Sequence, residues 1–330
     1  MRRLPVYLLI DCSESMAGAA IDDVNKALQC MVRDLRAMPQ ALDTVAMSLI
    51  AFSSDARVVV PLTPIELFQL PAMTIRPGTS LGRALDLLSA CASIDVVRTT
   101  KDRKGDWRPL VFLFTDGQPT DDWRGAVDRL KALTSPRIAN IYAIGSGVDV
   151  DYSALHEITD IVLKAEDISK AFVWITASVQ SASVGITEGM DRLPQLGADS
   201  ALKEVPKGEY VPETEPRQVF VNARCSKSKG DYLMRFVRDQ QGGPYMAAAS
   251  HKLEGADAGF GAKLPPMQSA RLAGVPACPY CSNRSAAVCG CGGAMCIDMN
   301  KPEGVICPHC GTEQKGGFTS GNFDIRQSQG

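Results

Sequence analysis

The sequence predicts an α/β protein with a doubly wound, mostly parallel sheet, followed by a small β-rich domain that binds metal. Over the first 180 or so residues, apolar runs of strand length alternate with amphipathic segments at helical spacing, which is typical of a parallel sheet with covering helices. The run Leu110–Phe114 is wholly apolar, as expected for a central strand buried on both faces. Seven of the eleven cysteines crowd into residues 278–310, which indicates a metal-binding module near the end of the chain.

Each element of the predicted α/β region rests on its own residue pattern. The expected strands are Val6–Ile10, Val45–Phe52, Arg57–Val60, Leu110–Phe114 and Ile138–Ile144. The turn Ser53-Ser54-Asp55 predicts a hairpin between the second and third of them. Apolar stripes at helical spacing are centred on Ile21–Leu35, Leu81–Leu88 and Trp123–Leu133, and a last helix is expected from Ile168 to about Val179.

The pattern changes from about residue 183, where Pro, Gly and charged residues interrupt every periodic segment. A hairpin is predicted from Gln218–Arg224 and Asp231–Arg238 around the turn Ser226–Gly230. The polar end of the chain is expected to be flexible. We therefore expect an α/β domain over 1–182, a linker with a β-hairpin over 183–275, a cysteine-rich zinc-ribbon-like module over 276–315 and a flexible tail over 316–330.

Composition narrows the classes of function. The net charge of −2 argues against a broad nucleic-acid-binding surface or an acidic tail. No stretch approaches the roughly 20 apolar residues of a membrane-spanning helix, so no membrane partner is expected. The apolar run Val6–Ile10 is too short for the core of a signal peptide, and Asp11 ends it. These features predict a cytoplasmic location.

Three separated segments predict one cation site. The first strand ends in Asp11-Cys12-Ser13-Glu14-Ser15, Pro77-Gly78-Thr79-Ser80 precedes the second helical stripe, and Thr115-Asp116-Gly117 follows the central strand. In an open α/β sheet the carboxyl ends of the strands meet where ligands bind. Hydroxyl and carboxylate oxygens suit Mg²⁺ or Mn²⁺, which take about six oxygen ligands and keep several waters. The expected ligands are Asp11, Ser13, Ser15, Thr79 and Asp116, acting directly or through water.

The segments DCSES, PGTS and FTDG resemble the metal-ion-dependent adhesion site of von Willebrand factor A domains, over about residues 1–180. This resemblance implies a von Willebrand A fold and a module that binds proteins, not a catalyst. Glu14 departs from the family pattern, because glycine usually occupies that position. The departure leaves the five oxygen-donating positions intact and adds a carboxylate beside the ion.

The cysteine-rich segment predicts zinc. Cys278-Pro-Tyr-Cys281 and Cys307-Pro-His-Cys310 are two C-P-x-C turns, and four thiolates from two such turns suit tetrahedral zinc. Cys289, Cys291 and Cys296 lie between them. Either His309, His251 or Cys225 completes a second zinc site with these three, or some of the three are structural thiols.

An A domain, an intervening β segment and a cysteine-rich end together resemble the TerY-type tellurium-resistance proteins over nearly the whole chain. The resemblance implies partnership with a Ser/Thr protein kinase and a metal-dependent Ser/Thr protein phosphatase, within a stress response. We therefore expect a non-enzymatic adaptor whose cation accepts an acidic group from a partner. A metal-dependent phosphohydrolase is the first alternative, although Ser13 stands where the D-x-D motif of one such class needs a second carboxylate. A zinc-ribbon protein associated with nucleic acid is the second, although basic and aromatic residues do not cluster near 278–310.

Overall fold

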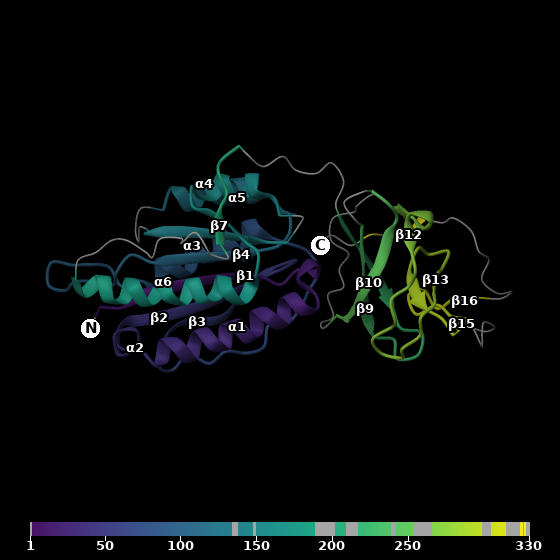
Figure 1. Cartoon of the computed structure of the whole chain (residues 1–330), viewed down its shortest axis with the longest axis horizontal. Helices are drawn as coiled ribbons and strands as arrows, with labels where there is room; N and C mark the ends of the chain where they lie inside the picture. The colour runs from purple at the N-terminus through teal and green to yellow at the C-terminus, as the bar shows by residue number, and fades with distance from the viewer. Residues whose placement is uncertain are drawn as a thin grey trace. The chain divides into compact units, whose positions relative to one another are not determined.

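The computed structural model describes most of the chain, with its helices and strands drawn in Figure 1. The described residues are 2–133, 138–147, 150–188, 202–208, 217–238, 242–253, 266–298, 305–314, 324–325 and 327. They form two compact units, the first built mainly from residues up to 212 and the second mainly from residues after 212. Among the described residues, no helix has the length and apolar character needed to cross a membrane.

A seven-stranded sheet in the order β3-β2-β1-β4-β5-β6-β7 forms the centre of the first unit. Neighbouring strands from β2 to β6 pair in parallel, whereas β3 and β7 pair antiparallel at the two edges. The strands are β1 (Leu4–Asp11), β2 (Val45–Phe52), β3 (Ala56–Pro64), β4 (Leu110–Thr115), β5 (Asn140–Ser146), β6 (Val162–Ala165) and β7 (Leu202–Glu204). The prediction of a mostly parallel, doubly wound sheet is confirmed.

Helices cover both faces of this sheet because alternate strand residues are apolar on both sides. On β4, Val111 and Leu113 belong to one core cluster with residues of α3, α4 and α5. Phe112 and Phe114 point to the other face. The ring centroid of Phe112 lies 6.4 Å from that of Trp174, and the ring centroid of Phe114 lies 5.7 Å from that of Phe172, both in α6. In Figure 1, α1 and α6 accordingly lie across the sheet from α4 and α5. The helices are α1 (Ala19–Arg36), α2 (Pro39–Thr44), α3 (Leu81–Asp95), α4 (Trp123–Lys131), α5 (Tyr152–Ile158) and α6 (Ile168–Glu188).

The predicted elements of the first unit are present with small differences in their ends. The hairpin between β2 and β3 is confirmed by their antiparallel pairing. The helix expected to end near Val179 continues as α6 to Glu188. Beyond Val179 its buried face includes the small residue Ser183, so the apolar periodicity fades although the helix does not end. The strands β6 and β7 were not predicted, because four and three residues are too few to show a period.

The second unit is built around a six-stranded sheet in the order β12-β10-β9-β8-β14-β13. The predicted hairpin is confirmed as β8 (Gln218–Arg224) paired antiparallel with β9 (Asp231–Val237). The remaining strands of the sheet are β10 (Tyr245–Lys252), β12 (Leu272–Ala273), β13 (Ala286–Val288) and β14 (Ala294–Cys296). Its core includes alternate residues of β8 and β9, among them Val219, Val221, Met234 and Phe236, which lie on one face of the sheet.

Two of the predicted segment boundaries differ from the observed sheets. The six-stranded sheet crosses the expected boundary at 275/276, because β14 from the cysteine-rich segment pairs in parallel with β8 of the hairpin. The hairpin and the cysteine-rich segment are therefore one folded unit. Within the tail expected to be flexible, Asp324–Ile325 forms β17, which pairs antiparallel with β11 (Met267–Gln268). A further hairpin joins β15 (Val305–Ile306) to β16 (Glu313–Gln314).

Candidate metal sites

The first candidate site begins where β1 and β4 end side by side. The two strands are parallel neighbours, with Ile10 opposite Phe114, so Asp11 and Thr115 leave the sheet together. The Thr115 hydroxyl donates a hydrogen bond of 2.5 Å to Asp11 Oδ2. Asp11 is fully buried, and Asp116, the next residue after Thr115, is 6% exposed. The strand register thus brings the two predicted acidic ligands to the same edge of the sheet.

The two predicted serine ligands follow Asp11 in a tight loop. The Cys12 amide donates to the Phe52 carbonyl at 2.8 Å, which fixes the start of the loop against β2. Glu14–Met16 then forms a single 3₁₀ turn. The hydroxyl oxygens of Ser13 and Ser15 lie 2.8 Å apart, and both residues are buried. The spacing of the two serines therefore places their hydroxyl groups in contact, as is needed for two ligands of one ion.

Thr79 lies on a third loop that hydrogen bonds hold to the loops after β1 and β4. The Gly78 amide donates to Glu14 Oε2 at 2.7 Å. The Thr79 amide donates to the Thr120 hydroxyl at 3.1 Å, and the Thr120 amide donates to the Thr79 carbonyl at 2.9 Å. Hydrogen bonds thus link the loop of Thr79 to the loop after β1 and to the loop after β4, as the predicted convergence of three loops at the strand ends requires. That Asp11, Ser13, Ser15, Thr79 and Asp116 jointly bind one ion stays a prediction.

The donor atoms of this site fit a hard divalent cation. Thr79 is 1% exposed, and its hydroxyl oxygen has no hydrogen-bond partner among the described residues. A buried polar atom without a partner costs free energy, so native proteins rarely keep one without a ligand, ion or water. A cation bound at the neighbouring serines and carboxylates would provide that partner for Thr79. Sequence reasoning missed Thr115, whose hydroxyl orients Asp11, because a threonine at the end of a strand carries no specific signal.

The second and third candidate sites are two groups of four cysteines. The hairpin cluster contains Cys225, Cys278, Cys281 and Cys296, and the C-terminal cluster contains Cys289, Cys291, Cys307 and Cys310. Within each cluster all four sulfur atoms lie within 4.8 Å of one another. Every one of these cysteines is a free thiol. Four thiols gathered in this way are the ligand set of a closed, tetrahedral structural zinc site.

Four similar turns present these thiols. In the turns Cys225–Gly230, Cys278–Asn283, Cys289–Gly293 and Cys307–Thr312, the first cysteine's amide donates to the carbonyl of the last residue at 2.8–3.0 Å. In each turn that cysteine's own carbonyl accepts from the residue just before the last. This penultimate residue has a positive φ in every case, between 62° at Lys229 and 82° at Gly292. The four turns therefore share one backbone geometry.

The predicted pairing of the two C-P-x-C turns in one site is wrong. Cys278 and Cys281 belong to the hairpin cluster, whereas Cys307 and Cys310 belong to the C-terminal cluster. The reason is the parallel pairing of β14 with β8, which brings Cys296 next to the turn at Cys225. All seven cysteines predicted as ligands lie in the two clusters, and Cys225 is the eighth clustered cysteine. Neither His309 nor His251 belongs to either cluster.

His309 has a structural position instead. One of its ring nitrogens lies 2.8 Å from the Ala294 carbonyl oxygen. The ring also packs against Gly293, where a β-carbon would lie only 2.5 Å from it. The C-P-H-C turn therefore uses its histidine to dock the turn on β14, and not as a metal ligand.

The thiol pKa values within the two clusters are shifted in both directions. Burial opposes ionisation of Cys225, yet hydrogen bonds from Ser228 and nearby amides outweigh it and lower the pKa of that thiol to about 6. Hydrogen bonds with Thr312 lower the pKa of Cys310 to about 6 as well. Burial raises the pKa of Cys281 to about 12 and also raises the pKa of Cys307. Because a metal binds thiolates, loading each cluster releases protons, so metal affinity weakens as the pH falls.

The two cysteine clusters differ in solvent exposure, so we expect their cysteines to become accessible in a fixed order when metal is removed. The hairpin cluster has three buried cysteines and lies in the larger core, whereas Cys310 is exposed and Cys291 is partly exposed. In metal-loaded protein treated with a chelator, we expect N-ethylmaleimide to label the C-terminal cluster first. Peptide mass spectrometry measures this order, with exposed Cys30 as the immediately labelled reference. Equal labelling rates in the two clusters would contradict the prediction.

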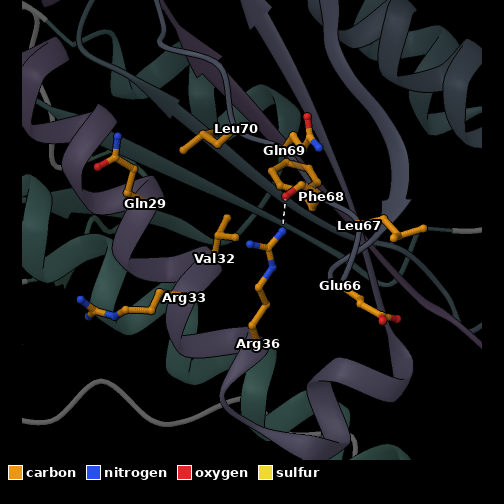
Figure 2. A pocket seen from close by; sticks show the side chains of 9 residues that line it. All are labelled: Gln29, Val32, Arg33, Arg36, Glu66, Leu67, Phe68, Gln69 and Leu70. Carbon is orange, nitrogen blue, oxygen red and sulfur yellow. Dashed lines mark hydrogen bonds between the residues drawn. The ribbon is translucent and has the colours of Figure 1, made fainter.

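The first unit also has a surface pocket, which is separate from the candidate metal sites. Figure 2 shows it between α1, which contributes Val32 and Arg36, and the segment Glu66–Leu70 after β3. The Arg36 guanidinium donates to the carbonyls of Ile65 and Phe68 and so holds this segment against the helix. The pocket contains none of the predicted metal ligands.

Comparisons with known proteins agree with this architecture. The von Willebrand factor type A domain family matches residues 6–178, and the TerY-C metal binding domain family matches residues 261–330. Solved structures similar to this chain include proximal thread matrix protein 1 from the mussel byssus, at 17% identity and a TM-score of 0.41 over 55% of this chain and 48% of that one. The ArnB paralog VWA2 from Sulfolobus acidocaldarius has 17% identity and a TM-score of 0.39 over 54% of this chain and 45% of its own.

A third structure, the conserved hypothetical protein BatB from Bacteroides thetaiotaomicron, is matched over its whole length and 57% of this chain, at 16% identity and a TM-score of 0.39. The match spans slightly less than half the length of the mussel and Sulfolobus proteins. The family matches cover most of the sheet that carries the strand-end site and the region that contains seven of the eight clustered cysteines. The chain belongs to the von Willebrand factor type A domain family and joins that domain to a TerY-C metal binding domain, the combination of TerY-type proteins.

Proposed function

We propose that this protein is a non-enzymatic adaptor that binds partner proteins through a cation on its A domain. The cation is Mg²⁺ or Mn²⁺, held by Asp11, Ser13, Ser15, Thr79 and Asp116. An acidic group of the partner completes its coordination. The two cysteine clusters each hold a zinc ion, and these ions stabilise the second unit.

The observation that carries this proposal is the buried hydroxyl of Thr79, which has no hydrogen-bond partner among the described residues. It lies on the loop that hydrogen bonds tie to both Glu14 and Thr120. The three hydroxyl ligands are neutral, so Asp11 and Asp116 balance the two charges of the ion without a surplus of negative charge, and its remaining coordination positions are left to water. Mg²⁺ retains exchangeable waters in such sites, and one of them can be replaced by an outside carboxylate or phosphate.

The zinc ions have a structural purpose in this proposal. Apart from its cysteines, the smaller core beside the C-terminal cluster contains only Ala287, Met295 and Ile297 as buried side chains among the described residues. A core of this size cannot stabilise a fold alone, so metal binding supplies much of the folding free energy. Removing zinc from the C-terminal cluster is therefore expected to unfold the segment around that cluster rather than to stop a reaction.

The proposed partners are proteins that carry acidic or phosphorylated segments. From its resemblance to TerY-type proteins, we propose that this protein acts in tellurite resistance or another stress response. Its proposed partners are a Ser/Thr protein kinase and a metal-dependent Ser/Thr protein phosphatase. Such partners suit the site because both handle phosphorylated or acidic protein segments, which can reach a cation. The A domain supports an interaction module over an enzyme, since domains of this family generally bind other proteins.

Changing Thr79 tests the cation site without disturbing its carboxylates. Thr79→Ala is expected to lower Mg²⁺ affinity by about 10- to 100-fold, the range typical when a metal site loses a supporting group. Thr79→Ser keeps the hydroxyl and is expected to retain affinity close to that of the unchanged protein. Isothermal titration calorimetry of the full chain with Mg²⁺ and with Mn²⁺ measures both effects.

The matched control is Thr176→Ala. Thr176 is buried in α6, where its hydroxyl donates to the Phe172 carbonyl, so this variant removes a buried hydroxyl far along the chain from the site. It should bind Mg²⁺ normally. If Thr79→Ala binds Mg²⁺ as well as Thr176→Ala does, the proposed ion is not bound at this site.

A further inference from the structure

Glu14 is a buried acid placed between the two serines of the cation loop. It is fully buried and begins the 3₁₀ turn Glu14–Met16, which also contains Ser15. Its Oε2 accepts a hydrogen bond of 2.7 Å from the Gly78 amide. A buried carboxylate is costly unless it is hydrogen bonded, and a bond to a charged acceptor is stronger than one between neutral groups. Glu14 therefore makes a strong link between two loops that are 64 residues apart in sequence.

Gly78 suits this link because its backbone lies in the left-handed region, with φ of 83°. Residues with a side chain rarely adopt that conformation, so the glycine allows the loop to turn its amide toward Glu14. The next residue is Thr79, the proposed ligand. A hydrogen bond to Gly78 consequently fixes the position of the Thr79 hydroxyl relative to the serine loop.

Three consecutive residues of this loop are each hydrogen bonded to a different segment of the chain. Gly78 is held by Glu14, and Thr79 is held by Thr120 through two hydrogen bonds. Ser80 is held by the turn between β2 and β3, since its amide donates to the Ser53 carbonyl at 2.6 Å and its hydroxyl donates to the Ser54 carbonyl at 2.9 Å. Of these links, only the one from Glu14 joins the loop of Thr79 to the loop that carries Ser13 and Ser15.

We propose that Glu14 is a positioning residue of the cation site: its carboxylate holds Gly78, and through it Thr79, at the right place relative to Ser13 and Ser15. In this arrangement the acceptor oxygen of Glu14 is what matters, and its charge is not needed by the ion. This inference rests on the proposed function of the site. It assigns a purpose to the one residue at which the D-x-S-x-S segment departs from the family pattern.

Two substitutions separate the acceptor oxygen of Glu14 from its charge. Glu14→Gln keeps an oxygen that can accept from Gly78 and removes the charge, whereas Glu14→Ala removes both. We expect Glu14→Ala to lower Mg²⁺ affinity by about 10- to 100-fold, as is typical when a group that orients a ligand is lost, and Glu14→Gln to stay within about threefold of the unchanged protein. Calorimetry of the full chain with Mg²⁺ gives the affinities, and Glu66→Ala serves as the control because Glu66 is an exposed acid.

A second readout needs no metal. Hydrogen–deuterium exchange of the metal-free full chain, followed by mass spectrometry of peptides that contain Gly78, reports whether its amide is held. Glu14→Ala should exchange at least about tenfold faster there, since a hydrogen bond to a charged group is lost, and Glu14→Gln should remain protected. Peptides from β4 should not change, which shows that the sheet is still folded.

The outcomes are distinct. If Glu14→Gln loses as much Mg²⁺ affinity as Glu14→Ala, the charge of Glu14 acts on the ion and the positioning proposal is overturned. Unchanged exchange at Gly78 in Glu14→Ala would overturn it too. If the unchanged protein binds no Mg²⁺ but the exchange results are as expected, the proposed cation site fails while the link between Glu14 and Gly78 stands.

Discussion

Replacing Cys225 by serine is expected to unfold the second unit and to remove one equivalent of zinc. Cys225 is buried and provides one of the four sulfur atoms of the hairpin cluster. Structural zinc contributes about 10–16 kcal/mol in small zinc-binding peptides, whereas whole domains are stable by about 5–15 kcal/mol. Losing a ligand of such a site therefore threatens the entire fold of the unit. The A domain has its own sheet and core and should remain folded.

Metal analysis and hydrogen exchange of the full chain measure this effect. Unchanged protein should contain two equivalents of zinc and Cys225→Ser one or fewer, with fast exchange in β8, β9 and β10 and normal exchange in β1 and β4. Cys30→Ser is the control, because Cys30 is exposed and belongs to neither cluster. Two retained equivalents in Cys225→Ser would show that Cys225 is not a ligand and would favour other sets of four thiols.

The fold of the first unit could be predicted because its strands and helices leave strong local patterns. Leu110–Phe114 is wholly apolar, since Val111 and Leu113 pack on one face of the sheet while Phe112 and Phe114 contact α6 on the other. Elements without a clear pattern were missed. The strand β6 has four residues, and the antiparallel edge strand β7 has three. Such short segments are determined by the neighbours they pair with and not by their own periodicity.

The ligand sets of the cysteine clusters could not be predicted from spacing. A C-x-x-C pair specifies a local turn, and both predicted turns are present. Which turns share an ion depends on strand pairing between distant segments. The pairing of Ala294 with Ala223 brings Cys296 close to Cys225, and spacing within 278–310 cannot indicate this contact. Cys225 is also inconspicuous because Ser228, and not a second cysteine, lies three residues after it.

The residues of the strand-end site could be proposed from the sequence, but the groups that hydrogen bond to them could not. Asp11, Thr79 and Asp116 were predicted as ligands because each lies next to a predicted strand or helix end, where parallel sheets bring loops together. The hydrogen bonds of Thr115 to Asp11 and of Gly78 to Glu14 depend on side-chain conformation in the folded protein. No motif reports such conformations. Glu14 was expected to add a charge beside the ion, and its observed bond to a backbone amide suggests a different purpose.

Asp11→Asn is expected to reduce Mg²⁺ affinity by more than about 100-fold. At about 4 Å and an effective dielectric constant of about 20, two unit charges interact by about 4 kcal/mol, and each 1.4 kcal/mol is about a factor of ten in affinity. Losing the charge of Asp11 beside a divalent ion therefore removes most of the binding. The protein should stay folded, because asparagine keeps an oxygen that can accept the hydrogen bond from Thr115.

Two further variants test whether the loss of Mg²⁺ affinity is specific to the charge of Asp11. Asp11→Ala should lose Mg²⁺ binding as well, and its melting temperature should also fall because the buried Thr115 hydroxyl loses its acceptor. Asp128→Asn removes an exposed acid from α4 and should bind Mg²⁺ normally. Calorimetry gives the affinities, and thermal unfolding separates loss of the ion from loss of the fold. If Asp11→Asn binds Mg²⁺ as tightly as Asp128→Asn, then Asp11 is not a ligand, and any cation-dependent docking must use another part of the protein.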